Sequence, residues 1–246
     1  MPNYQITIEY LGTNYVGWQI QKNGTSIQSL VQRALNKTLK SKININGSGR
    51  TDAGVHALGQ SANFFFNNEI KEKFKFLNTS NHFLKNTTIS ILNLKKRNKN
   101  FHARHSAKKR LYEYIICNRA GNLTINKNRS WLIKKKLDIK KMKKAINYLR
   151  GTHNFSAFRS SSCSAKNPIR TINKVNIEKK GDKIIIKFES KSFLQKQVRS
   201  MVGCLKYVGE NKWKPEKIKN VINLKKRKLC APPAPPEGLY LKNVFY

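Results

Sequence analysis

The segment GSGRTDAGVHALGQSANFFF, residues 47–66, passes from a glycine-rich loop into a run with the composition of a β-strand. The loop places Asp52 beside Arg50, although the whole chain has only 12 acidic residues against 50 lysines and arginines. Glycine lets another stretch of backbone approach closely, and a carboxylate held near an arginine stays ionised. We therefore take Asp52 as a candidate nucleophile or base. A turn-forming aspartate is the alternative.

Apolar patterns on both sides of this segment predict an α+β fold. Alternation predicts strands over residues 4–10, 61–66, 111–117 and 239–246, and a hairpin over residues 175–190 that turns at Gly181 and Asp182. Apolar spacing predicts helices over residues 27–39 (capped by Ser26), 139–149 and 194–208. We expect a mostly antiparallel sheet with helices on one side.

The chain of 246 residues is long enough for one or two domains. Residues 94–100 (LKKRNKN) are polar and basic, which is typical of a junction. We expect two similar halves, residues 1–100 with the Asp52 loop and residues 101–246.

The formal net charge of +38 indicates a polyanionic partner, of which nucleic acid is the commonest. A genome rich in A and T would explain much of the lysine content but not the scarcity of acidic residues. No apolar run approaches the roughly 18 residues that span a bilayer, and the N-terminus lacks a secretory pattern. We therefore expect a cytoplasmic protein with no membrane partner.

The cysteine and histidine positions do not predict a metal site. The four cysteines (117, 163, 204 and 230) form no CxxC pair and are expected to be small core residues in a reducing compartment. His56 is expected to pack inside the fold. His102 and His105 fall on a predicted strand, where a spacing of three would point them to opposite faces.

Three known glycine-loop motifs do not fit residues 47–60. The third glycine of the dinucleotide-binding motif is replaced by Asp52, which would repel a pyrophosphate. The lysine of a P-loop and the H-x-E and P-C-x-x-C elements of the zinc deaminases are also missing.

The string GRTDAGVHALGQ closely resembles the signature of the tRNA pseudouridine synthase A family. Later blocks resemble that family in the same order: FHARHSAKKRLYEYII, GTHNFSAF, KNPIRTI, FLQKQVRSMVG and PPEGLYL. The resemblance covers essentially the entire chain. Gln195, Lys196 and Gln197 and an extra APP unit depart from the family pattern, and they could alter local RNA contacts.

The resemblance implies an isomerase that converts uridine to pseudouridine at positions 38, 39 and 40 of the tRNA anticodon arm. Asp52 would be the catalytic residue, acting covalently or by removing a sugar proton, with neither cofactor nor metal. Tyr112 would stack on the target uracil, Arg199 would pair with Asp52, and Arg50 would hold the flipped nucleotide. The two halves would flank a basic cleft in a homodimer.

Two other classes of function stay open at this point. A non-catalytic RNA-binding protein would not need a carboxylate near its RNA. A metal-dependent nuclease would need clustered carboxylates, but the other aspartates, Asp138 and Asp182, fall in a lysine-rich helix start and a turn.

Overall fold

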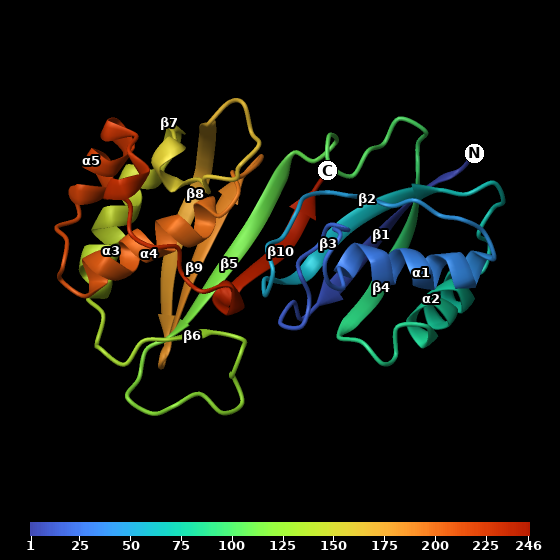
Figure 1. Cartoon of the computed structure of the whole chain (residues 1–246), viewed down its shortest axis with the longest axis horizontal. Helices are drawn as coiled ribbons and strands as arrows, with labels where there is room; N and C mark the ends of the chain where they lie inside the picture. Colours follow the sequence, from blue (N-terminus) through green and yellow to red (C-terminus); the bar gives the residue numbers. More distant parts are fainter. The chain divides into compact units, whose positions relative to one another are not determined.

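The computed structural model describes residues 1–246, and its contacts divide the chain into two compact units (Figure 1). The first unit comprises residues 1–108 and 240–246, and the second comprises Lys109–Leu239. The division thus falls after Lys108 rather than after residue 100, and the end of the chain returns to the first unit.

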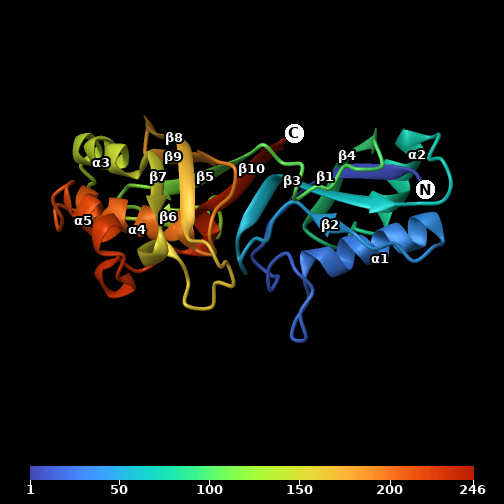
Figure 2. The ribbon, with the colours of Figure 1, turned by 90° about the horizontal axis from the view of Figure 1, so that it is seen from above.

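The first unit contains β1 (Asn3–Tyr10), α1 (Ile27–Leu39), β2 (Asn46–Gly47), β3 (His56–Phe65), α2 (Lys73–His82), β4 (Ile89–Arg97) and, from Tyr240 onward, β10 (Leu239–Phe245). Its strands run in the order β4-β1-β3-β10, with β2 on β3. All these pairs are antiparallel except β3 with β10, which are parallel. Figure 2 shows the same unit from above, with β1 between β3 and β4.

Local sequence explains the predicted helix of this unit. The Ser26 side chain accepts a hydrogen bond from the Ser29 amide (3.2 Å), so α1 begins where the capping residue predicts. The helix buries Ile27, Val31, Ala34 and Leu35 on one face. Both predicted bounds of α1 are confirmed.

Residues 94–100 correct one expectation, because they begin inside β4 instead of forming a junction. Leu94 is buried and pairs with Ile6 of β1, so the strand continues into this basic segment. Leu94 is the one apolar residue of LKKRNKN, so the composition of this segment predicts a polar linker although the segment begins in a half-buried strand.

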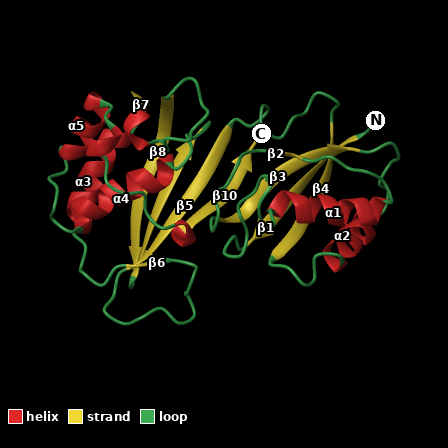
Figure 3. Cartoon of the chain, in the orientation of Figure 1, coloured by secondary structure: helices red, strands yellow, loops and turns green.

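The second unit contains β5 (Lys109–Cys117), β6 (Trp131–Leu132), α3 (Ile139–Ala145), β7 (Gly151–Asn154), β8 (Ile169–Lys180), β9 (Lys183–Ser190), α4 (Gln197–Gly209) and α5 (Lys217–Leu224). Four short 3-10 helices accompany them: η1 (Ile146–Leu149), η2 (Ser156–Phe158), η3 (Arg227–Leu229) and η4 (Pro236–Gly238). The strand order is β5-β9-β8-β7, with β6 on β5. Figure 3 shows the helices of this unit grouped beside its strands.

Alternate residues of β9 are buried, as expected for a sheet that helices cover on one side. The apolar face of α4 (Val198, Met201, Val202, Leu205 and Val208) is buried. The hairpin turns at Gly181, whose φ is +58°. The predicted α+β class with a mostly antiparallel sheet is confirmed. No helix has the length and apolar character needed to cross a membrane.

Candidate active site

Backbone and side-chain hydrogen bonds anchor the start of the Asp52 loop to strand β3. The Ser48 amide donates to the Ser61 carbonyl (2.7 Å), and the Ser48 hydroxyl donates to Gln60 Oε1 (2.7 Å). Gln60 Nε2 in turn donates to the Gly49 carbonyl (2.9 Å). Ser48 and Gln60 are both buried, so these bonds hold the loop where water does not compete.

A tight turn follows at the candidate nucleophile. The Val55 amide donates to the Asp52 carbonyl (3.1 Å), and Gly54, the third residue of this turn, has φ +76°. A positive φ at this position is characteristic of a type II turn and favours glycine. The motif D-A-G-V therefore fixes the backbone of Asp52. Asp52 is half-buried, and Arg50 is exposed.

Residues 10–18 contact the Asp52 loop and support it. The Trp18 amide donates to the Thr51 carbonyl (3.1 Å), and the Tyr10 hydroxyl lies 2.9 Å from Thr51 Oγ1. A Cβ atom on Gly17 would lie 2.6 Å from the Thr51 carbonyl oxygen, and one on Gly12 would lie 2.0 Å from that of Val55. The loop therefore depends on two close backbone approaches that only glycine allows.

Sequence reasoning missed this supporting segment. The available signal was the pair of glycines at positions 12 and 17 beside Trp18, a buried aromatic residue. A Cβ on Gly47 would lie 2.4 Å from the Trp18 indole nitrogen, so Trp18 contacts the loop at two places.

His56 has the structural role that we expected. Its ring is fully buried, Nδ1 accepts a hydrogen bond from the Gly12 amide (2.9 Å), and the Tyr240 ring lies 4.7 Å away between centroids. Nδ1 therefore carries no proton, and the imidazole joins β3 to the segment behind the loop.

The expectation that His102 and His105 lie on a strand was wrong. His105 lies in a turn that His102 precedes, the Ser106 amide donates to the His102 carbonyl (2.9 Å), and the two ring centroids are 4.4 Å apart. His102 Nδ1 accepts from the Arg104 amide (3.1 Å), which stabilises this turn. No group of three or more His, Cys, Asp or Glu side chains is placed to hold a metal ion.

The second unit holds Tyr112, the tyrosine selected by the resemblance, and its neighbour Tyr114. Tyr114 is fully buried and donates its hydroxyl hydrogen to the Pro235 carbonyl (2.8 Å). Burial, followed by the nearby Glu237 charge, raises the pKa of Tyr114 far above its ordinary value. Tyr112 retains 8% exposure and meets the Phe193 ring edge-on at 5.2 Å. Tyr114 is therefore the structural member of the pair.

Helix α4 carries Arg199, and the segment before β10 orients its guanidinium group. Arg199 Nε donates to the Ala234 carbonyl (2.7 Å), and the Ala234 amide donates to the Arg199 carbonyl (2.9 Å). A Cβ on Gly203 would lie 2.0 Å from the Pro232 oxygen, so this segment runs directly against the helix. Asp52 and Arg50 belong to the first unit and Tyr112 and Arg199 to the second, and the pairing of Asp52 with Arg199 stays a prediction.

The other two aspartates have structural partners. Asp138 caps α3 by accepting from the Lys141 amide (3.0 Å). Asp182, in the β8–β9 turn, pairs with Arg119 at 2.9 Å.

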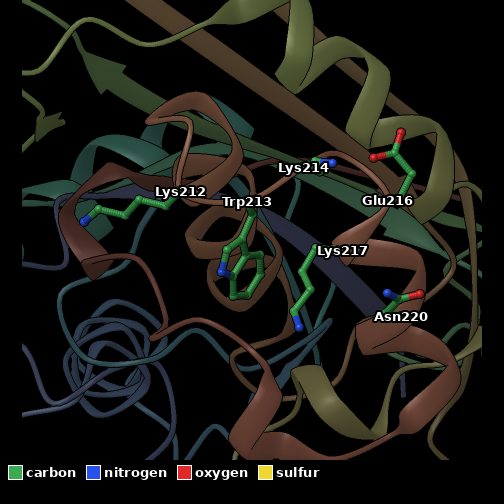
Figure 4. Close-up of a pocket in the computed structure, with 6 residues that line it drawn as sticks. All are labelled: Lys212, Trp213, Lys214, Glu216, Lys217 and Asn220. Carbon is green, nitrogen blue, oxygen red and sulfur yellow. The ribbon is translucent and has the colours of Figure 1, made fainter.

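A cavity of about 640 Å³ lies in the second unit and is lined by Lys212, Trp213, Lys214, Glu216, Lys217 and Asn220 (Figure 4). Figure 4 shows the Trp213 indole beside the Lys217 side chain. None of the four predicted site residues lines this cavity.

Comparison with known proteins identifies relatives over the whole chain. A family model described as tRNA pseudouridine synthase matches residues 6–113 and 145–246. A tRNA pseudouridine synthase A from Pelagibacter ubique (strain HTCC1062) is 57% identical over 246 residues, covering 100% of both chains. Its counterpart from Ehrlichia chaffeensis (strain ATCC CRL-10679 / Arkansas) is 45% identical over 244 residues, covering 99% of each.

A solved structure of a Cbf5-Nop10-Gar1 complex aligns with a TM-score of 0.35 and 11% identity, covering 82% of this chain and 45% of that one. The ranges that the family model matches include Arg50, Asp52, Tyr112 and Arg199.

Proposed function

The chain belongs to the tRNA pseudouridine synthase family, and we propose that it isomerises uridine at positions 38, 39 and 40 of the tRNA anticodon arm. It is an isomerase of tRNA processing. The main observation behind a reaction at Asp52 is the anchored loop, in which hydrogen bonds and two close glycine contacts position this residue. Such fixed positioning is what covalent or general-base catalysis by one carboxylate requires.

The proposed reaction exchanges one bond to ribose for another. The bond from uracil N1 to ribose C1′ breaks, the base turns, and a bond from C5 to C1′ forms. The C5 proton leaves and N1 gains one, so substrate and product contain the same atoms. This balance needs neither water nor a redox cofactor or metal. Asp52 starts the reaction either by covalent attack on the nucleotide or by removing a ribose proton.

The other three residues act on the nucleotide or on Asp52. We assign Tyr112 to stacking on the target uracil and to movement of the C5 proton, because Tyr114 is already bonded to Pro235. Arg199 pairs with the Asp52 carboxylate; its Nε bond to Ala234 supports this role by fixing the guanidinium plane. Arg50, exposed on the loop, holds the flipped nucleotide out of the stack.

Charge supports RNA as the partner. A net charge of +38 favours contacts with phosphates, which are independent of sequence and weaken with salt. Action at three neighbouring positions fits recognition of RNA shape better than base reading. We further propose a homodimer, which light scattering would test, and a cytoplasmic location, where tRNA is processed.

We expect the protein to release tritium from tRNA labelled at uracil C5, and to do so equally well in EDTA. The C5 proton is lost in every turnover, while the isomerisation itself needs no metal ion. The measurement is tritium release under single-turnover conditions with and without EDTA. A nuclease would instead be inhibited by EDTA and would shorten the RNA.

Two tyrosine variants separate the proposed catalytic role from a structural one. Tyr112→Phe should lower tritium release by the folded protein about 100-fold, in the range for loss of a proton-transferring group. Tyr114→Phe loses its bond to Pro235 and should lower the free energy of unfolding by about 1 kcal/mol, with the activity of the folded protein unchanged. Equal losses of activity would contradict the assignment of Tyr112.

A further inference from the structure

Two cysteine thiols from distant parts of the second unit are in contact. Cys204 Sγ on α4 lies 3.4 Å from Cys230 Sγ, in the segment that follows η3. The other two cysteines have other partners: Cys117 Sγ lies 3.4 Å from Asp182 Oδ2, and the Cys163 amide donates to the Ser160 carbonyl (3.1 Å). The expectation that all four cysteines are simple core residues therefore does not describe this pair.

Main-chain contacts on both sides hold the two sulfur atoms together. The Cys230 amide donates to the Arg227 carbonyl (3.0 Å), which closes η3 immediately before the cysteine. On the other side, the Ala234 amide donates to the Arg199 carbonyl of α4 (2.9 Å). The close approach of Pro232 to Gly203 then places the intervening segment against the helix.

The two thiols have different environments. Cys230 is half-buried, and its pKa lies below the ordinary value because the Cys204 thiol donates to it and because the Arg227 guanidinium group is near. The same contact and burial raise the pKa of Cys204. Arg227 is itself held by the Ala157 carbonyl (3.1 Å) and Ser200 Oγ (3.3 Å). A half-buried thiol with a lowered pKa thus lies against a buried thiol with a raised pKa.

We propose that Cys204 and Cys230 form a peroxide-sensitive dithiol site, with Cys230 as the reacting cysteine and Cys204 as the resolving one. The Cys230 thiolate attacks one oxygen of a hydroperoxide, the O–O bond breaks, and hydroxide leaves. The Cys204 thiol then attacks the sulfur of the resulting sulfenic acid. A disulfide forms and water leaves. In total, two thiols are oxidised and one hydrogen peroxide is reduced to two water molecules.

Forming the disulfide requires the two sulfur atoms to move closer and would link the Cys230 segment to α4. The sulfur atoms must approach from 3.4 Å to about 2.05 Å, and Cys230 lies outside the helices and strands. The bond would tie this segment covalently to α4. Because Ala234 of the same segment bonds to Arg199, the redox state would be connected to the position of that arginine. The site itself is independent of the function proposed above.

The test is a thiol count on the full chain after treatment with hydrogen peroxide. We expect the four titratable thiols of the denatured protein to fall to two and to return to four with dithiothreitol. Mass spectrometry of a non-reducing digest should find the Cys204 and Cys230 peptides linked. An uncrosslinked digest, or oxidation of Cys163 before Cys230, would overturn the proposal.

Three variants supply matched controls. Cys163→Ser, at another half-buried cysteine, should still lose two thiols. Cys204→Ala should leave Cys230 as a sulfenic acid that dimedone captures. Cys230→Ser should keep Cys204 reduced. Because Cys230 is less buried than Cys204, this variant still tests the proposal if Cys204→Ala does not fold. Oxidation of Cys204 in Cys230→Ser at the wild-type rate would contradict the assignment of the reacting cysteine.

Discussion

Replacing Asp52 with asparagine is expected to lower pseudouridine formation by at least about 1000-fold while the protein stays folded. The side chain keeps its shape but loses the negative charge, so its oxygen is too weak a nucleophile and base for attack or proton removal. Loss of a catalytic group typically has an effect in this range. The turn at Asp52 is made by main-chain atoms, the Asp52 carbonyl and the Val55 amide, so asparagine can retain it. Single-turnover tritium release measures the effect.

The other two aspartates provide matched controls, because each Asp→Asn change removes the same charge from a chain of net charge +38. Asp138→Asn should be nearly neutral, since asparagine also caps helices. Asp182→Asn weakens a partly exposed pair with Arg119, and solvent screens this pair, so the free energy of unfolding should change little. Neither variant should change tritium release.

Binding distinguishes the proposed enzyme from a protein that only binds RNA. Asp52→Asn should bind tRNA at least as tightly as the wild type at a fixed salt concentration, because phosphate contacts dominate affinity. Full tritium release by Asp52→Asn would disprove the catalytic role of this carboxylate. Absence of release from the wild type as well, with tight tRNA binding by both proteins, would favour the binding function.

Elements with strong local signals were predictable from the sequence. Ser26 supplies a capping oxygen, and the apolar spacing that follows predicts both ends of α1. Glycine at position 181 predicts the turn between β8 and β9 because its φ is positive there. In contrast, α2 buries only Phe76 and Ser80, so its sequence has little amphipathic pattern. It was not predicted, since its position depends on contacts with other elements, such as the Ser80 hydroxyl bond to Thr38 of α1 (3.1 Å).

The candidate site was predictable only in part, for the same reason. The sequence motif identifies Asp52, but the groups that position it come from elsewhere in the chain. Gln60 binds the loop from within β3, and Gly17 lies against Thr51 from the segment before α1. The contact between Cys204 and Cys230 depends on the path of the proline-rich segment over α4. Such contacts leave no periodic pattern, because both partners are set by tertiary packing.

Gly17→Ala is expected to lower the free energy of unfolding by about 3 kcal/mol. Two unfavourable effects coincide at this position. The residue has φ +107°, which costs about 1–2 kcal/mol for a residue with a Cβ, and the new methyl group would lie 2.6 Å from the Thr51 carbonyl oxygen. Relief of such an overlap typically costs a further 1–3 kcal/mol or so. Urea unfolding of the full chain measures the change.

Three further glycines separate these two effects. Gly181 has a positive φ but nothing within 4 Å of a new Cβ, so Gly181→Ala should lose about 1 kcal/mol from strain alone. Gly12→Ala adds an overlap with Val55 without a positive φ, and Gly121→Ala adds neither and should be neutral. Because Gly12 and Gly17 both contact the Asp52 loop, the folded fraction of their alanine variants should also release less tritium. Gly181→Ala should release tritium as the wild type does. If Gly17→Ala instead matched Gly181→Ala in both stability and activity, the close backbone contact would not be what positions Asp52.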